Sequence, residues 1–354
     1  MYKIYQTFFI LLLVSFFVSC NSDIENIGYE PTPPQVDYEA LKAYKASDHE
    51  IMFGWFGGWN GPGTTMATSL MSLPDSVDMV SNWGQPWPLT DVQMEDLKNV
   101  REIKGTKVLA CIFTPYLGRY LEPADREERL EYWGWGDTQE ERDEAVRKYA
   151  KALAEEIIKW GYDGLDIDNE PEFMGEPAHI YESPGRFKIF IETLGEYFGP
   201  KSGTDKILAI DGYVTNYVYQ DLSPYFNYFI LQSYYENTYA RYDVRFNTVA
   251  NYFKETRKEL AKKIILTEDF EQYSSSGGRT FLQRDGSYTI STLGMANWQP
   301  LDEDKNEVKK GGAGLYHIEY DYRNSNRPYH FTRQMINIMS TSDESLETET
   351  EEKE

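Results

Sequence analysis

Two patterns of hydrophobic and polar positions alternate along the chain between Tyr44 and Ser340. Short apolar runs predict buried strands, and longer segments with apolar residues every three or four positions predict amphipathic helices. The eight predicted strands are His49–Trp59, Ser76–Trp83, Lys107–Pro115, Gly161–Glu170, Lys206–Tyr213, Tyr228–Tyr235, Lys263–Asp269 and Gly312–Tyr320. Repeated strand–helix units of this kind are typical of a parallel β-sheet covered by helices.

Five of the predicted helices have clear signals, and the strongest lies at Thr138–Trp160. Thr138 and Glu141 have the spacing of a capping box, and Gly161 follows at the expected end. The other four helices are Thr90–Lys104, Pro184–Phe198, Val244–Ala261 and Pro328–Ser340. Eight strands in eight units predict an α/β fold with a single (β/α)8 TIM barrel, whose site lies at the carboxyl ends of the strands.

The amino terminus is predicted to be a targeting segment. Lys3 precedes an apolar run at residues 8–18, which is short for a membrane span and is followed by a serine and Cys20. The segment resembles a bacterial lipoprotein signal, in which Cys20 becomes the lipidated first residue; a secretory peptide with an incidental cysteine is the alternative. We therefore expect a signal peptide at residues 1–19, a lipid-anchored tether at residues 20–43, and an exported lipoprotein on the outer membrane and cell surface.

Composition and charge narrow the class of protein. With 41% hydrophobic and 26% charged residues, the chain is typical of a folded protein. An α/β barrel commonly takes about 250 residues as one domain, which we expect at residues 44–340. The formal net charge of −23 argues against nucleic-acid binding. Residues 341–354 hold seven acids, one lysine and almost no apolar residue, so we expect a disordered acidic tail. We expect a monomer.

Cysteine and histidine are too few to suggest a thiolate or histidine metal centre. Apart from Cys20 the only cysteine is Cys111, which lies in an apolar predicted strand, so we expect a buried thiol and no intramolecular disulfide. The four histidines lack the tight spacing of a zinc motif. We expect no metal and no cofactor, although carboxylates alone leave a metal site open.

The strongest chemical signal lies at the end of the fourth predicted strand. From Asp163 the chain reads Asp-Gly-Leu-Asp-Ile-Asp-Asn-Glu. Side chains alternate along a strand, so Asp166, Asp168 and Glu170 share the face toward the barrel interior. Burial and like charge both raise a carboxyl pKa, so at least one of these acids should hold a proton near neutral pH. A glycosidase needs such a proton donor, and Glu170, nearest the mouth, is predicted to supply it; a divalent-metal site or a structural cluster is the alternative.

The octapeptide matches the Asp-Gly-x-Asp-x-Asp-x-Glu signature of family 18 glycoside hydrolases, which the chain therefore resembles. The resemblance implies a retaining, substrate-assisted reaction in which the 2-acetamido group of the sugar is the nucleophile. It implies that Glu170 protonates the glycosidic oxygen and later activates water. It also implies that Asp168 orients the acetamide and that Asp166 shares a proton with Asp168. Asp163, of opposite parity, is expected to position backbone.

Two further groups of residues are candidates for substrate contact. Gln232 and Tyr234 share a face of the sixth predicted strand, and in similar enzymes a tyrosine at this place donates to the acetamido oxygen. Ordinary packing of Tyr234 is the alternative. Aromatic rings suit the faces of sugars, and Trp55 and Trp83 are the predicted substrate contacts. The wider predicted platform also includes Phe56, Trp59, Trp87, Trp133 and Trp135.

One departure from the family pattern narrows the expected substrate. The third predicted strand lacks the Ser-x-Gly-Gly element that many chitinases of this family carry. Together with its single-domain size and expected lipid anchor, this makes the chain look more like the endo-β-N-acetylglucosaminidases of the family, which cleave the chitobiose core of N-linked glycans. An N-linked glycan or glycoprotein is therefore the expected partner. A chitinase, or a surface glycan-binding lipoprotein with an inactive barrel, is the alternative.

Overall fold

Eight parallel strands close into a barrel in the order β1-β10-β7-β6-β5-β4-β3-β2. The structure is a computed structural model that describes residues 36–63, 65–173 and 178–351. The barrel strands are β1 (Ile51–Phe56), β2 (Met79–Asn82), β3 (Lys107–Phe113), β4 (Gly164–Asn169), β5 (Ile207–Gly212), β6 (Tyr228–Gln232), β7 (Ile264–Asp269) and β10 (Gly312–Tyr316). Each strand lies within its predicted range, so the predicted (β/α)8 barrel is confirmed.

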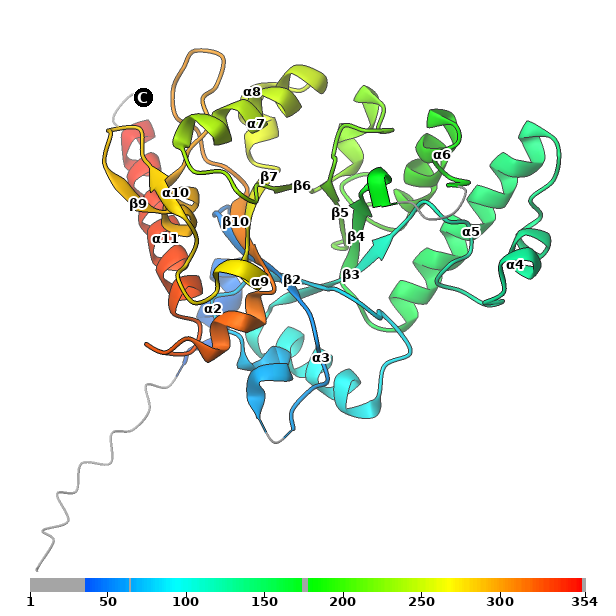
Figure 1. Cartoon of the computed structure of the whole chain (residues 1–354), viewed down its shortest axis with the longest axis horizontal. Helices are drawn as coiled ribbons and strands as arrows, with labels where there is room; N and C mark the ends of the chain where they lie inside the picture. Colours follow the sequence, from blue (N-terminus) through cyan, green and yellow to red (C-terminus); the bar gives the residue numbers. More distant parts are fainter. Residues whose placement is uncertain (1–35, 64, 174–177, 352–354) are drawn as a thin grey trace, which may run out of the picture. The chain divides into compact units, whose positions relative to one another are not determined.

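Helices surround the strands, with α5 and α6 packed on one side of the barrel and α10 and α11 on the other (Figure 1). The α-helices are α2 (Tyr38–Lys45), α3 (Asp91–Lys104), α4 (Arg126–Trp133), α5 (Gln139–Lys159), α6 (Pro184–Leu194), α7 (Tyr239–Tyr252), α8 (Arg257–Ala261), α9 (Phe270–Tyr273), α10 (Ser291–Asn297) and α11 (His330–Glu351). Short 3-10 helices lie at Met66–Thr68, Leu70–Ser72, Pro171–Phe173, Gln220–Tyr225 and Ile318–Arg323.

The predicted capping box of α5 is confirmed. The Thr138 hydroxyl accepts from the backbone N–H of Glu141 at 3.2 Å, and the Glu141 carboxylate accepts from the backbone N–H of Thr138 at 3.0 Å. Two of the otherwise unpaired donors at the helix start are thereby satisfied. Gly161 follows the helix with φ +86°, a conformation that suits glycine and turns the chain toward β4.

The predicted helix at Val244–Ala261 is wrong as one element, because the structure has α7 and α8 in its place. Phe253 leaves the helix in an extended conformation and stacks on Phe229 of β6, with ring centroids 4.7 Å apart. Thr256 then caps α8 by accepting from the backbone N–H of Glu259. Burial of an aromatic ring on the barrel therefore overrides the helical periodicity at this point.

Two other elements also differ from the sequence expectation. A hairpin of β8 (Thr280–Leu282) and β9 (Tyr288–Ile290) was not predicted, because three-residue strands are too short to show a hydrophobic pattern. Helix α11 continues to Glu351, so the backbone of residues 341–351 is helical where disorder is expected. Buried Met335 and Met339 anchor this helix, and extending an anchored helix adds one hydrogen bond per residue.

The apolar core has two layers, which meet at the barrel wall. Leu165 and Ile167 of β4 belong to the outer layer, between strands and helices. The interior layer is built from alternate residues of the strands, among them Trp55, Cys111 and Ala209. Asp166 lies between Leu165 and Ile167 in sequence and is fully buried on the opposite, interior face. The alternation predicted for this strand is therefore confirmed.

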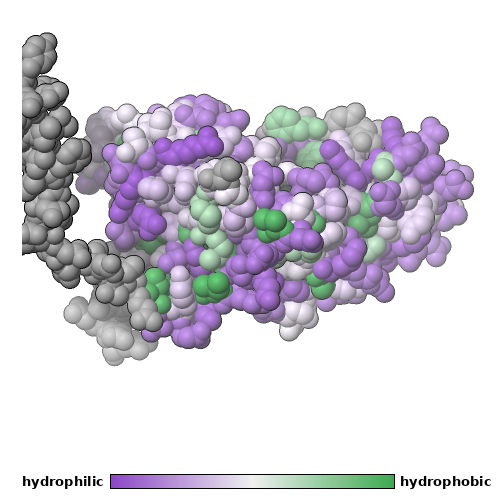
Figure 2. All heavy atoms as spheres, turned by 90° about the horizontal axis from the view of Figure 1, so that it is seen from below, coloured by the Kyte–Doolittle hydropathy of each residue, from purple (hydrophilic) through white to green (hydrophobic). Residues whose placement is uncertain are grey.

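The compact unit begins at Tyr38, a few residues before the domain start expected at residue 44. Lys45 at the end of α2 donates to the Thr106 hydroxyl at 3.0 Å, which ties this helix to the loop before β3. The expected signal peptide and Cys20 lie outside the described residues. Among the residues that are described, no helix is both long and apolar enough to cross a membrane. The face seen in Figure 2 is mainly hydrophilic, with scattered hydrophobic residues.

Candidate active site

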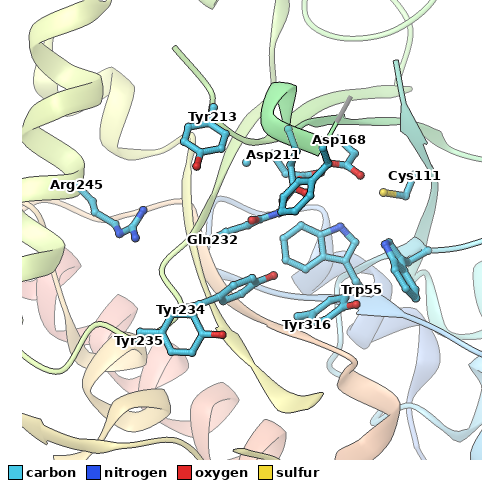
Figure 3. A pocket seen from close by; sticks show the side chains of 14 residues that line it. Trp55, Cys111, Asp168, Asp211, Tyr213, Gln232, Tyr234, Tyr235, Arg245 and Tyr316 are labelled. Atoms are coloured by element: carbon cyan, nitrogen blue, oxygen red, sulfur yellow. The ribbon is translucent and has the colours of Figure 1, made fainter. Parts of the chain in front are cut away.

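A cavity of about 590 Å³ opens at the carboxyl ends of the barrel strands. Size and position are those of a ligand site in this class of fold. Figure 3 shows side chains from several strands converging on the cavity. The residues that line it include Trp55, Trp83, Cys111, Asp168, Glu170, Phe173, Asp211, Tyr213, Gln232, Tyr234, Tyr235, Arg245 and Tyr316.

The acids of β4 are arranged in depth. Asp166 is fully buried beneath the cavity, while Asp168 and Glu170 line it. Carboxylate oxygens of Asp168, Glu170 and a third acid, Asp211, lie within 4.8 Å of one another. The strand therefore delivers its carboxyl groups in a row from the interior to the mouth, as the sequence predicts.

Asp166, the deepest acid, is held by a neighbour from across the barrel. Trp55 of β1 donates its indole N–H to Oδ2 of Asp166 at 2.9 Å. Burial raises the pKa of Asp166 to about 6, although the hydrogen bond from Trp55 opposes that shift by favouring the charged form. Asp166 can therefore gain or lose its proton at a pH at which enzymes ordinarily work.

The anionic form of Asp168 is disfavoured more strongly than that of Asp166. Burial, followed by the negative charges of Glu170 and Asp166, raises the pKa of Asp168 to about 8. Because part of this shift comes from the Glu170 charge, a proton on Glu170 makes ionisation of Asp168 easier. The two residues therefore compete for protons, which is the property that a proton donor and a neighbouring carboxylate need.

The sequence patterns did not identify Asp211 as a residue of the site. It is the last residue but one of the apolar strand β5, where the barrel register pairs it directly with Asp168. Its side chain is buried, and its Oδ1 accepts from the Gln232 amide at 3.0 Å. Burial and the charges of the β4 acids raise the pKa of Asp211 well above its ordinary value. A single acid at the end of an apolar strand was the signal that could have identified it.

The β6 candidates both line the cavity, as their shared face predicts. Gln232 reaches Asp211, while Tyr234 lies beside Tyr316 of β10 with ring centroids 6.0 Å apart (Figure 3). Burial, and next the charge of Asp211, raises the pKa of Tyr234 well above its ordinary value. The phenol therefore keeps its proton and can act as a hydrogen-bond donor inside the cavity.

Only part of the predicted aromatic platform lines the site. Trp83 is 41% exposed at the rim, whereas Trp55 is 2% exposed and forms the floor. The platform is wrong for the remaining rings, which are absent from the lining and pack in or against the core between strands and helices: Phe56, Trp59, Trp87, Trp133 and Trp135. For Phe56 the reason is the strand alternation that separates it from Trp55.

Other aromatic rings and one arginine line the cavity in place of the predicted rings. Tyr316 packs edge-on against Trp83, with ring centroids 5.5 Å apart, and Tyr213 and Tyr235 follow the ends of β5 and β6. Arg245 of α7 points toward the cavity from the side (Figure 3), and its Nε lies 3.0 Å from Oε1 of Glu236. These residues were missed because loop and helix positions reach the cavity only through the fold.

Asp163 lies at the end of β4 away from the cavity. Its carboxylate holds an arginine and a backbone N–H in position, as its opposite parity predicts. Its two oxygens form a paired ion contact with Arg101, at 2.7 Å to Nε and 2.7 Å to Nη2. Oδ2 also accepts from the backbone N–H of Val108 at 3.0 Å. The first acid of the octapeptide therefore fastens β3 and α3 to β4 and lies away from the cavity.

Among the residues that the structure describes, two groups of side chains have the spacing to hold a metal ion. One is Asp168, Glu170 and Asp211, and the other is Cys111, Asp166 and Asp211. Cys111 is buried, as predicted, and burial raises the pKa of its thiol well above the ordinary value. A neutral thiol is a poor metal ligand, so only the carboxylate group has suitable donors for a hard cation.

Comparison with known proteins supports a family assignment. The model of glycoside hydrolase family 18, BT1044-like, matches residues 23–338. Endo-β-N-acetylglucosaminidase F2 of Elizabethkingia meningoseptica is 27% identical over 303 residues, which cover 82% of this chain and 79% of that protein. The structure of selenomethionine BT1044 with a glutamate-to-glutamine substitution is 30% identical, with a TM-score of 0.73, and covers 85% of this chain and 91% of that one.

A more distant structure supports the fold. An endo-β-N-acetylglucosaminidase from Cordyceps militaris, solved in complex with fucosyl-N-acetylglucosamine-Asn, is 22% identical with a TM-score of 0.61. The likeness covers 85% of this chain and 95% of that chain. At this identity it indicates the same barrel architecture.

Proposed function

The chain belongs to glycoside hydrolase family 18, and we propose that it is an endo-β-N-acetylglucosaminidase that cleaves the chitobiose core of N-linked glycans. One observation carries the proposal: Asp168, Glu170 and Tyr234 line a single cavity at the carboxyl ends of the strands. The similarity to endo-β-N-acetylglucosaminidase F2 supports the choice of substrate. The resident groups supply an acid, a carboxylate and a neutral donor without a cofactor.

Glu170 begins the reaction as the proton donor. It is the acid nearest the mouth of the cavity, and its neighbours Asp168 and Asp211 favour its protonated form through their negative charge whenever they are ionised. Its proton passes to the glycosidic oxygen as the bond from that oxygen to the anomeric carbon breaks. The leaving group is the N-acetylglucosamine that stays on the asparagine.

The sugar on the other side of the bond supplies its own nucleophile. Its acetamido carbonyl oxygen attacks the anomeric carbon, and a cyclic oxazolinium ion forms. While Glu170 is protonated, its charge no longer repels a negative charge on Asp168. Asp168 then accepts a hydrogen bond from the acetamide N–H and stabilises the positively charged oxazolinium ring. Tyr234 donates its hydroxyl to the acetamido oxygen and fixes the direction of attack.

Water completes the reaction from the face that the leaving group has vacated. Glu170, now a carboxylate, takes a proton from this water as the oxygen bonds to the anomeric carbon and the oxazolinium ring opens. Two displacements at one carbon retain its configuration. Asp166 stays beneath Asp168 and takes up or returns the proton that the two share.

A glycan-release assay tests this function. The protein without its signal peptide is incubated with a high-mannose N-glycoprotein, a complex N-glycoprotein and chito-oligosaccharides, and products are identified by mass. We expect free glycans and a protein that keeps one N-acetylglucosamine at each cleaved site. Preferred hydrolysis of chito-oligosaccharides would identify a chitinase. Absence of any product, with glycan binding equal in wild type and Glu170→Gln, would identify a binding protein.

We also propose that Cys20 is lipidated and holds the enzyme on the outer membrane, at the cell surface. The proposal rests on the lipoprotein-like order of a basic residue, an apolar run and a cysteine at the amino terminus. A tether that ends near Tyr38, where the compact unit begins, would present the barrel to glycoproteins outside the cell.

A further inference from the structure

Asp211 lies where the two halves of the acid cluster meet. Its ligating oxygen is within 4.8 Å of those of Asp168 and Glu170, which line the cavity. A carboxylate oxygen of Asp211 also lies within 4.8 Å of an Asp166 oxygen and of the Cys111 sulfur beneath them. The Asp211 and Asp166 carboxyl groups are within hydrogen-bonding reach of each other. No other acid belongs to both of these groups.

The two oxygens of Asp211 have different surroundings. Oδ1 accepts from the Gln232 amide at 3.0 Å. Oδ2 is buried and has no hydrogen-bond donor among the described residues, and the same holds for Oδ1 of Asp166. Two ionised carboxylates in contact repel and leave both oxygens unsatisfied, whereas one proton between them makes a strong hydrogen bond.

The number of protons that the cluster needs also indicates a proton on Asp211. Four carboxyl groups lie together, and the arginine that lines the cavity, Arg245, is ion-paired to Glu236. In the proposed reaction Glu170 must hold one proton and Asp168 must be an anion. Asp166 then holds the proton that it shares with Asp168, and a second proton inside the cluster, which reduces the remaining repulsion, can lie only on Asp211.

We propose that Asp211 holds this second proton: it is a positioning residue that stays a neutral carboxylic acid through the working pH range and donates from Oδ2 to Asp166. Asp168 is thereby left free to carry the negative charge beside the substrate. This assignment rests on the proposed substrate-assisted reaction for its purpose, and on the cluster geometry for the proton itself. Burial, and next the negative charges of Asp166 and Asp168, raises the pKa of Asp211 well above its ordinary value, which agrees with a neutral acid at this position.

The titratable groups that interact with Asp211 favour or permit its neutral form, among them the Tyr181 phenol before α6, which keeps its proton because burial raises its pKa. Asp166 and Asp168 on β4, and Glu170 directly after it, oppose a further negative charge. The Cys111 thiol on β3 and the Tyr234 phenol, two residues beyond the end of β6, both keep their protons. The Gln232 amide favours the anion, but burial outweighs this effect on the pKa of Asp211.

The proton can be observed without any substrate. The chain is produced with 13C-labelled aspartate carboxyl groups, and the Asp211 signal is identified by its loss in Asp211→Asn. We expect the chemical shift of a protonated acid from pH 5 to pH 8. The shift of a carboxylate at pH 7 would overturn the assignment, whether or not the enzyme releases glycans. Failure of the proposed function is thus distinguishable from failure of this inference.

Kinetics of two substitutions test the positioning of the other acids. In Asp211→Asn the amide oxygen can accept from Gln232 and the amide N–H can donate to Asp166, as the neutral acid does. Asp211→Ala leaves Asp166 without this donor, so we expect kcat to fall by about 10²-fold, with Asp211→Asn rescuing at least about tenfold of that loss. Circular dichroism of both variants controls for folding.

The alkaline limb of the kcat profile separates positioning from a purely structural contribution. If Asp211 is neutral, Asp211→Asn changes no charge, and the limb that reports loss of the Glu170 proton stays where it is in wild type. If Asp211 is an anion, the substitution removes a negative charge and moves this limb to lower pH. That movement, or equal damage by asparagine and alanine, would overturn the proposal.

Discussion

Trp55 donates its indole N–H to Oδ2 of Asp166 at 2.9 Å and thereby joins β1 to β4 across the interior of the barrel. The two strands are not neighbours in the sheet. A tryptophan predicted to bind sugar therefore also satisfies the deepest acid of the cluster. Its indole body lines the cavity (Figure 3), while its N–H is directed to Asp166.

Replacing the Trp55 indole N–H should change the pKa of Asp166, the deepest acid of the cluster. In Trp55→Phe the ring remains but Asp166 loses a hydrogen bond that favours its charged form, so we expect the pKa of Asp166 to rise. The acidic limb of the kcat profile should move to higher pH, and the free energy of unfolding should fall by about 1–3 kcal/mol. Trp83→Phe, at the exposed rim, is the matched control and should leave the limb in place. Equal profiles for the two variants would contradict the assignment.

Raised carboxyl pKa values predict that the fold is more stable in mild acid than in mild base. The pKa of Asp166 is about 6 and that of Asp168 about 8 in the folded state, against about 3.9 for an unfolded aspartate. Between about pH 4 and pH 8 these two carboxyl groups thus bind more protons in the folded protein than in the unfolded chain, and their contribution to stability falls as pH rises.

A variant that cannot ionise should lose part of this pH dependence. We expect Asp168→Asn to reduce the drop in unfolding free energy between pH 5 and pH 8 by at least about 1 kcal/mol, measured by urea denaturation. Asp221→Asn is the control, because Asp221 is exposed and its pKa is lowered by a hydrogen bond from Lys188. Parallel curves for wild type and Asp168→Asn would show that the cluster does not govern stability.

Removal of the proton donor should abolish turnover and leave binding intact. Glu170→Gln keeps the shape of the side chain but cannot protonate the glycosidic oxygen, so we expect kcat to fall by about 10²- to 10⁴-fold. Calorimetry with an N-glycopeptide should show an affinity close to that of wild type. Near-normal turnover would mean that another residue supplies the proton.

The first acid of the octapeptide should behave differently from the rest. Asp163→Asn weakens the paired contact with Arg101 and the tie to β3, so we expect a loss of about 1–3 kcal/mol in unfolding free energy. The kcat of the folded fraction should stay within about threefold of wild type. Asp205→Asn, an exposed acid that pairs with Lys107, is the matched control and should cost little. A large loss of kcat in Asp163→Asn would contradict its structural assignment.

The lipid anchor has its own test. Cys20→Ser should remove lipid labelling of the chain and release the protein from the membrane fraction, whereas Cys111→Ser should keep the label because Cys111 is buried in the barrel. Metabolic labelling with a fatty acid and fractionation of cells measure both effects. Labelling that survives in Cys20→Ser would disprove lipidation at this residue.

The parts of the site that could be predicted from the sequence are those that one strand determines by itself. Asp166 and Asp168 belong to one interior face because alternation along β4 is a local property. Gln232 and Tyr234 reach the cavity for the same reason. Asp163 could be separated from the other acids because its parity is opposite.

The parts that could not be predicted depend on contacts between distant segments. Asp211 matters because the barrel register places it against Asp168, and no local pattern in β5 shows that pairing. Arg245 lines the cavity from helix α7, and no local pattern of that helix shows which strand ends it reaches. The break at Phe253 depends on a ring of β6 that precedes it in the chain.

The two faces of β4 also bear on how such a protein could diverge. Leu165 and Ile167 support the barrel from one side, while Asp168 and the adjoining Glu170 face the cavity, where the sugar is proposed to bind, on the other. A single change on the sugar side could turn a hydrolase into a lectin-like receptor of identical architecture. Because a carboxyl buried among other carboxyls is costly, losing one would also make the barrel more stable. Inheritance of the fold and inheritance of the activity are therefore separable along this one strand.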